Sequence, residues 1–342
     1  MKYKLISIDL AKNVFQIALL DQQNTLVSNK KVPRNKLLHT LRQFSPTLVV
    51  MEACYSSNHW GRAISKLGHT VKLIPARLVK AFLIGNKNDA NDALAIAEAS
   101  QRPKIHFVAV KTIEQQDIQS LQRIREQLIK QSTANVNQLR GLLAEYGVIT
   151  GKTKANLMAA IPCCLEEPDN ELSSVARSFI HRLYERQKQL TEEVKAVTEQ
   201  MVSCASQHSD YQLLSGIPGV GPIIASNILG SINSINEFKN GRQLSAWLGL
   251  TPSQYSSGEH NRLGKITKRG NATLRKLLIQ GARAVINWCD RKNDPLSKWL
   301  QQLRKRTHDC KLTVALANKL ARIIWAVLSK QTPYDGKLAC AN

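Results

Sequence analysis

Four carboxylates in the first hundred residues are the side chains best suited to chemistry. Asp9 lies inside the apolar run 5–10, and Glu52 ends a second apolar run, 48–52. A charge in such a run is removed from water and needs a partner. Asp89 and Asp92 lie three apart in a helix-like stretch, so they share one helix face. The four acids could form an all-oxygen site for a hard divalent cation, expected to be Mg²⁺, and paired ions of that kind act on phosphodiesters.

Each acid alone also has a structural interpretation, because strand-end aspartates often form turns and acidic pairs at helix starts complement the macrodipole. The charge of the whole chain favours the metal site. Its net charge is +23, with 14 basic and 6 acidic residues in 1–100, 14 and 12 in 101–209, and 20 and 7 in 210–342. The basic ends predict a polyanionic partner. Nucleic acid is favoured over a membrane surface, since no basic amphipathic terminus or lipidation motif is present.

Length and composition exclude several other classes. A chain of 342 residues with 43% hydrophobic content can form two or three globular domains. Its seven cysteines are odd in number and form no C-x-x-C pair, which argues against a disulfide framework or a zinc site. No signal-like start and no apolar run of about 18 residues is found, so we expect a cytoplasmic protein without a membrane partner.

The hydrophobic pattern predicts an N-terminal α/β domain of the RNase H-like type over residues 1–110. The expected strands are 3–10, 14–20, 25–32, 47–52 and 70–74. The expected helices are 33–44, 59–67 and 90–100, and they lie between and after the last strands. A three-strand meander followed by alternating helix and strand is the order of that architecture. In it, the first strand's Asp9 and the fourth strand's Glu52 lie side by side.

Residues 111–208 show helical periodicity in two long runs, separated by the Gly- and Pro-containing stretch 147–168. They predict an antiparallel helical pair or coiled coil. Such a region could assemble chains or could serve as a spacer within one chain, and the pattern favours neither.

Residues 209–342 predict a mainly α domain that binds DNA. Glycines 216–221 precede a helix-like stretch as in a helix-hairpin-helix segment, so the backbone at Gly219 and Gly221 could approach phosphate, although a plain turn fits too. Candidate phosphate-binding side chains, which could equally be a solvated face, are Lys265, Lys268, Arg269 and Arg275. Nearby Ser256 and Ser257 are turn formers by composition. Residues 147–153 lack P-loop spacing, which excludes that mode of ATP binding.

These motifs resemble a known family. Ile-Asp-Leu-Ala-Lys at 8–12, Met-Glu-Ala-Cys at 51–54 and Asn-Asp-Ala-Asn-Asp-Ala at 88–93 resemble the acidic quartet of insertion-sequence transposases that share a RuvC-like domain with the Piv-type DNA invertases. The segments 216–221, 249–252 and 257–275 are similar to that family's C-terminal domain. The resemblance covers nearly the whole chain in the expected order.

The resemblance implies a recombinase in which the acids hold magnesium and Ser257 attacks a DNA phosphate, with Ser256 as the neighbouring alternative. A covalent phosphoserine would conserve the bond energy, so strands could be rejoined without ATP. The resemblance further implies double-stranded DNA as substrate, a structured noncoding RNA from the element as guide, and a homo-oligomer, a dimer or tetramer, in which one protomer's acids meet another's serine.

Two other functions compete with this one. A junction-resolving nuclease would use the same acids with water as the nucleophile, leaving Ser257 as a turn residue. A non-catalytic nucleic-acid-binding protein would need only the basic ends. The acids argue against the second, and the long basic C-terminal region argues against a minimal nuclease.

Overall fold

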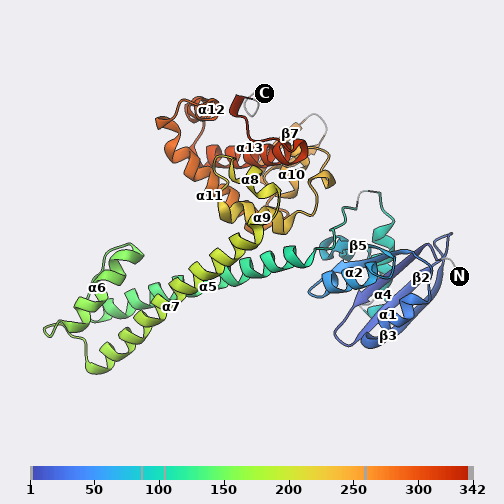
Figure 1. Ribbon diagram of the computed structural model, residues 1–342, viewed down its shortest axis with the longest axis horizontal. Helices are drawn as coiled ribbons and strands as arrows, with labels where there is room; N and C mark the ends of the chain where they lie inside the picture. The colour runs from blue at the N-terminus through green and yellow to red at the C-terminus, as the bar shows by residue number, and fades with distance from the viewer. Residues whose placement is uncertain (1–2, 86–87, 104, 258–259, 338–342) are drawn as a thin grey trace. The chain divides into compact units, whose positions relative to one another are not determined.

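A computed structural model describes residues 3–85, 88–103, 105–257 and 260–337 (Figure 1). The chain divides into two compact units, Met1–Ile113 and Glu114–Asn342. The N-terminal unit is built on a sheet. The second unit contains a pair of long helices followed by a mainly helical domain.

The N-terminal unit has a five-stranded mixed sheet in the order β3-β2-β1-β4-β5. Its strands are β1 (Leu5–Leu10), β2 (Val14–Leu20), β3 (Leu26–Pro33), β4 (Leu48–Ala53) and β5 (Thr70–Pro75). The first three form the expected antiparallel meander, and β4 pairs with β1 in parallel. This mixed sheet fits the RNase H-like domain that the sequence predicts.

Helices cover both faces of this sheet. Strand alternation sends Ile6 and Ile8 to a core beneath α1 (Leu37–Arg42) and α2 (Ser57–Ser65). Leu5 on β1 and Val50 on β4 belong to the opposite core, beneath α4 (Asp89–Ser100). The short helix α3 (Ala76–Val79) follows β5. Side chains of odd number on β1 and even number on β4 therefore face α4.

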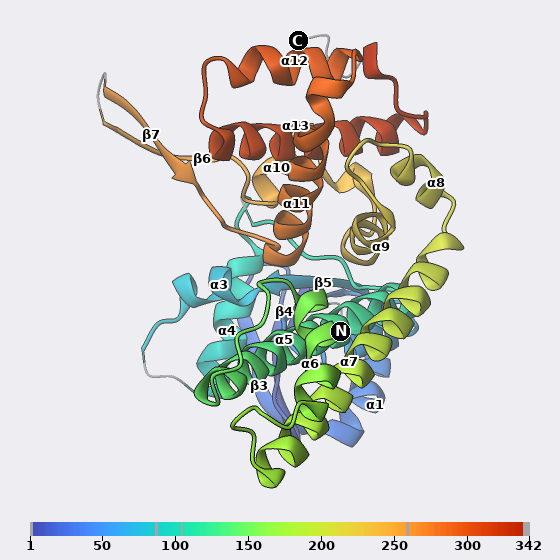
Figure 2. The same ribbon diagram turned by 90° about the vertical axis from the view of Figure 1, so that its left-hand side faces the viewer.

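In the second unit, α5 (Ile113–Glu145) and α7 (Ser174–Ser206) lie side by side and antiparallel (Figures 1 and 2). Arg125 donates to Thr198, and Asn135 donates to the Leu183 carbonyl. Residue numbers therefore increase along α5 in the direction in which they decrease along α7. The stretch 147–168, expected as a connection, contains α6 (Lys154–Glu166) with Pro162 inside it. Leu157 and Ile161 of α6 are buried against α5 and α7. This packing stabilises a helix that the Gly and Pro residues of the stretch made hard to predict.

The C-terminal domain is mainly helical around one apolar core. Its helices are α8 (Asp210–Ser215), α9 (Pro222–Ser231), α10 (Gly241–Trp247), α11 (Ala272–Trp288), α12 (Pro295–Arg304) and α13 (Asp309–Lys330). Of the helices in the described ranges, α13 alone is long and apolar enough to cross a membrane by length and composition. Because 56% of its apolar window is buried, it serves as a core helix of this domain.

A two-stranded ribbon interrupts these helices. Strands β6 (Pro252–Ser257) and β7 (His260–Ile266) pair antiparallel, and Figure 2 shows them extending away from α10, α11 and α13. Nearly every ribbon residue is exposed. Because its strands lack apolar alternation, the sequence pattern does not predict them.

Candidate active site

Asp9 and Glu52 are brought together by the parallel pairing of β1 and β4. Ile8 pairs with Met51, so Asp9 and Glu52 follow in the next row of the two strands. Both side chains are half-buried and face α4. The predicted juxtaposition of the first-strand and fourth-strand acids is therefore what the sheet register produces.

Asp89 and Asp92 enter from the first turn of α4, which packs on the same face. Asn88 caps the helix by accepting a hydrogen bond from the Asn91 amide. The Ser7 hydroxyl donates to the Ala93 carbonyl at 2.7 Å, which ties the helix to β1 two residues before Asp9. Two acids from the sheet and two from the helix thus lie on the same face of the sheet, near the start of α4.

The pKa of Asp9 reflects its burial and the nearby acids. The pKa of its carboxyl is raised from 3.8 to about 6, first of all by burial. The negative charges of the other three acids raise the pKa further, in the order Asp92, Asp89, Glu52. Asp9 therefore lies within electrostatic range of all three other acids. Such a perturbed carboxyl in a group of acids is typical of functional sites.

The donor set fits a divalent cation of the magnesium type, because all four side chains offer carboxylate oxygens. In the described ranges, no three Asp, Glu, His or Cys side chains already form a metal-ligating cluster. The exposed Asp89 pairs with Lys31 at 3.7 Å. An exposed ion pair of this kind contributes little free energy, so Asp89 can leave Lys31 and bind a divalent cation.

Ser256 and Ser257 lie near the tip of the β6–β7 ribbon on opposite faces. Ser257 pairs with His260, and Tyr255 pairs with Arg262, so these four side chains share one face. Ser256 shares the other face with Gln254, whose amide donates to the Ser256 hydroxyl at 2.9 Å. Ser257 thus stands among a tyrosine, a histidine and an arginine. Gly258, which follows Ser257 in the segment 257–275, lies outside the described residues.

The base of the ribbon depends on two glycines with positive φ. Gly249 has φ +70°, and a Cβ there would meet the Arg269 carbonyl oxygen at 2.3 Å. Gly270 has φ +107°, and a Cβ there would meet the Trp247 carbonyl oxygen at 1.8 Å. These close approaches hold the chain after β7 against the end of α10. The ribbon is therefore anchored at its base while its tip extends.

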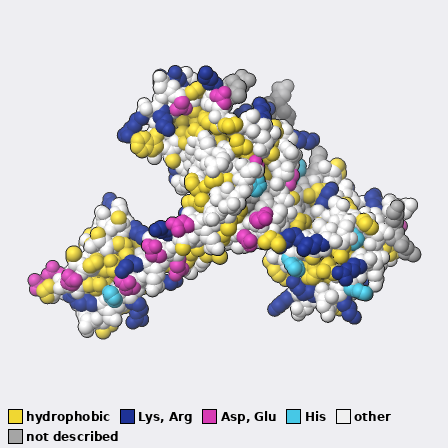
Figure 3. Space-filling view, in the orientation of Figure 1, with side chains coloured by type: hydrophobic (Ala, Val, Ile, Leu, Met, Phe, Trp, Pro, Cys, Tyr) yellow, Lys and Arg dark blue, Asp and Glu magenta, His cyan; other side chains and the backbone are white. Residues whose placement is uncertain are grey.

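The predicted phosphate-binding residues differ in their surroundings. Lys265, Lys268 and Arg269 are exposed. Arg275 is partly buried and donates to the Leu248 carbonyl at 3.0 Å, so part of its guanidinium holds the ribbon's base. On the face drawn in Figure 3, Lys and Arg predominate over the N-terminal unit, whereas both signs of charge lie along α5 and α7.

The glycine turn before α9 also has a packing role. Gly219 has φ +81°, and a Cβ there would meet the Gly281 carbonyl oxygen of α11 at 2.9 Å. Gly221 is the residue before α9 and has open space around its Cα. Close packing accounts for Gly219, and the backbone at Gly221 is the more accessible part of this turn.

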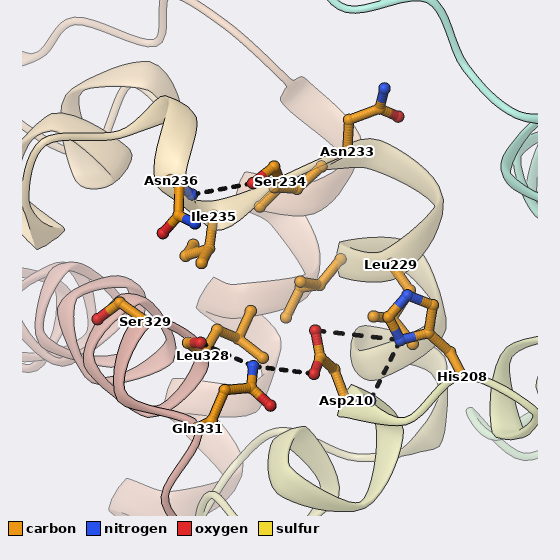
Figure 4. A pocket seen from close by; sticks show the side chains of 12 residues that line it. His208, Asp210, Leu229, Asn233, Ser234, Ile235, Asn236, Leu328, Ser329 and Gln331 are labelled. Atoms are coloured by element: carbon orange, nitrogen blue, oxygen red, sulfur yellow. Dashed lines mark hydrogen bonds and ion pairs between the residues drawn. The ribbon is translucent and has the colours of Figure 1, made fainter.

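A pocket of about 240 Å³ opens elsewhere in the C-terminal domain (Figure 4). Its polar side chains mostly bond with one another. Asp210 accepts from Gln331 at 3.1 Å and lies 4.0 Å from the His208 ring, which accepts from the Asp210 amide. These contacts join the start of α8 to the end of α13, which gives the pocket a structural explanation.

Comparison with known proteins identifies the family. Residues 6–148 match a family described as "Transposase", the DEDD group named for IS110, and residues 211–297 match "Transposase IS116/IS110/IS902 family". A Pseudomonas aeruginosa protein named "Probable family 20 transposase" is 41% identical over 98% of this chain and 99% of its own length. The chain belongs to the IS110 transposase family.

Other relatives agree. The "Transposase for insertion sequence element IS1111A" of Coxiella burnetii is 39% identical over 97% of this chain and 91% of its own length. The "Transposase for insertion sequence element IS1328" of Yersinia enterocolitica is 34% identical over 97% and 98%. The N-terminal unit is thus the DEDD, RuvC-like domain of a DNA transposase, and the chain is an enzyme that acts in DNA recombination.

Proposed function

We propose that this transposase uses Asp9, Glu52, Asp89 and Asp92 to hold Mg²⁺ and Ser257 to attack a DNA phosphate. The observation that carries the metal site is geometric: Asp9 and Glu52 follow the paired residues Ile8 and Met51, and α4 brings Asp89 and Asp92 to the same face of the sheet. The raised pKa of Asp9 agrees with this arrangement. A divalent metal held by these acids would neutralise charge on the reacting phosphate and lower the pKa of a hydroxyl.

The serine step transfers one phosphodiester from DNA to protein. The Ser257 oxygen forms a bond to phosphorus, the bond from phosphorus to one deoxyribose oxygen breaks, and the hydroxyl proton passes to a base. The released deoxyribose oxygen takes up a proton. The reverse step with another DNA hydroxyl rejoins a strand without ATP, because the phosphoserine keeps the phosphoester bond.

The ribbon face supports Ser257 as the nucleophile. His260 stands opposite it in the strand pair and can accept the hydroxyl proton as a neutral imidazole. Arg262, on the same face, can bind the non-bridging phosphate oxygens. Ser256 lacks this setting, because it faces away and accepts a bond from Gln254.

The proposed partners follow from charge and from the family. Exposed Lys265, Lys268 and Arg269, with the amides near Gly219 and Gly221, would bind the backbone of double-stranded DNA, and Arg275 would contribute the free side of its guanidinium. A structured RNA from the element would guide target choice. A homo-oligomer, a dimer or tetramer in the bacterial cytosol, would let the acids of one protomer act with the serine of another.

A denaturing gel tests the chemistry. Labelled DNA with a nick that slows rejoining is incubated in Mg²⁺ with wild type, Ser257→Ala and the matched control Ser256→Ala. We expect a covalent protein–DNA band in wild type and Ser256→Ala, and none in Ser257→Ala. Loss in Ser256→Ala alone would move the nucleophile by one residue. Cleavage without any adduct would favour a nuclease that uses water.

A further inference from the structure

A row of polar side chains crosses the sheet beneath α4 and extends beyond the acids. Asp9 pairs with Gln16 on β2, and Gln16 pairs with Lys31 on β3. Directly opposed residues of antiparallel strands project from the same side, so Gln16 faces the same region as Asp9. The row therefore runs Glu52, Asp9, Gln16, Lys31, with α4 lying over it.

Gln16 is buried, with 4% of its surface exposed, and it is anchored by its amide nitrogen. Its Nε2 donates to Asn29 Oδ1 at 2.5 Å, and Asn29 Nδ2 donates to the Ala90 carbonyl at 3.1 Å. Ala90 lies between the two acids of α4. This chain of bonds therefore joins β2 and β3 to the helix that carries Asp89 and Asp92.

The direction of this chain is fixed by its last member. A backbone carbonyl can only accept, so Asn29 must present its NH₂ group to Ala90 and its oxygen to Gln16. Gln16 must then present its own NH₂ group to Asn29. The remaining atom, Gln16 Oε1, is buried and has no hydrogen-bond partner among the described residues. A buried acceptor without a donor costs about 1–3 kcal/mol, so it calls for a partner that arrives with a ligand.

We propose that the Gln16 amide oxygen is an outer partner of the acidic site, which accepts a hydrogen bond from a water of the bound cation. Magnesium keeps several waters in protein sites, and these waters are strong donors. Outer groups of this kind orient the primary ligands and contribute about 10–100-fold to metal affinity. The same side chain, through Asn29, holds the helical acid pair over the sheet. The inference rests on the metal site proposed above.

The test uses the full chain, stripped of metal and free of DNA, with Mn²⁺ binding followed by calorimetry. Gln16→Met removes the oxygen and keeps the length of the side chain. Gln16→Glu keeps an oxygen acceptor but cannot donate to Asn29. Gln22→Met makes the same change as the first variant at an exposed position of the same domain. Metal-free Tm is measured for every variant.

We expect Gln16→Met to weaken Mn²⁺ binding about tenfold or more. Gln16→Glu should bind within a few-fold of wild type, and Gln22→Met should match wild type. Both Gln16 variants lose the hydrogen bond to Asn29, so a fall in metal-free Tm that they share reports the structural role of Gln16. The difference in Mn²⁺ affinity between the two variants reports the oxygen. If Gln16→Met does not fold, retained binding by Gln16→Glu supports the proposal and its loss overturns it.

Two results would overturn the proposal while leaving the acidic site intact. One is wild-type affinity in Gln16→Met. The other is equal loss of affinity and metal-free Tm in both Gln16 variants, which would make the residue a structural clamp only. Failure of the acidic site itself would give a different result. If the acids hold no metal, wild type would bind Mn²⁺ no more tightly than Asp9→Asn does.

Discussion

Asp9→Asn should stabilise the metal-free N-terminal unit at neutral pH. The folded pKa of Asp9, about 6, lies above the ordinary value of 3.8, so the native state binds its proton more tightly than the unfolded state. Stability therefore falls as pH rises from about 4 through about 6, and the cost is complete above that window. A shift of about two units corresponds to about 3 kcal/mol. Asp9 is half-exposed, and solvent screening reduces this to about 1.5 kcal/mol.

Amide hydrogen exchange of peptides from β1 and β2, in EDTA, measures the opening free energy of this unit alone. Wild type should lose about 1 kcal/mol or more between pH 4.5 and 7, while Asp9→Asn should lose distinctly less. Asp21→Asn, in the β2–β3 turn, makes the same chemical change as a control and should follow wild type. Equal pH dependence in wild type and Asp9→Asn would refute the convergence of acids around Asp9.

Magnesium should reverse the order of these variants. An ion at about 100 times its Kd stabilises the native state by about 2.7 kcal/mol, and this requires ionised ligands. Wild type should therefore gain protection with added Mg²⁺, whereas Asp9→Asn should gain little. Equal gains in both proteins would place the ion elsewhere.

Four further outcomes follow from the rest of the structure. Arg269→Ala should weaken binding to related and unrelated DNA equally and reduce the salt slope by about one, as measured by titrations at several salt concentrations. Gly270→Ala should destabilise the C-terminal domain by about 3 kcal/mol and lower Tm, because its Cβ would meet a backbone oxygen. His260→Gln should slow adduct formation about 100-fold and alter its pH profile, without changing DNA affinity. Ile124, 49% exposed on α5, should be needed for assembly, so sedimentation of Ile124→Glu should show a smaller species with little activity.

The N-terminal fold could be predicted because its signals are strong and local. Strand β2 was expected at the residues where it occurs, and β1, β3, β4 and β5 within a few residues, since apolar runs bounded by turns define them. The placement of Asp9 beside Glu52 then followed from the architecture. Gln16 is not among the residues predicted from the sequence, although a polar residue inside the strand Val14–Leu20 is a signal of the same kind as Asp9.

The second unit was harder to predict, because its features depend on contacts between distant residues. The ribbon has no apolar alternation, and its shape depends on Gly249 and Gly270 meeting backbone across the chain. For the same reason His260 and Arg262 could not be assigned beside Ser257 before the register was known. The helix α6 owes its stability to burial against α5 and α7, which its own sequence does not reveal.

Mapping the trapped adduct tests the central claim most directly. Wild-type protein covalently joined to nicked DNA in Mg²⁺ would be digested with nuclease and trypsin and then sequenced by mass spectrometry. Cleavage after the basic residues yields one peptide, 243–262, which contains Tyr255, Ser256 and Ser257. The account predicts a nucleotide on Ser257. A nucleotide on Tyr255 or Ser256, or DNA cleavage with no modified peptide, would contradict it.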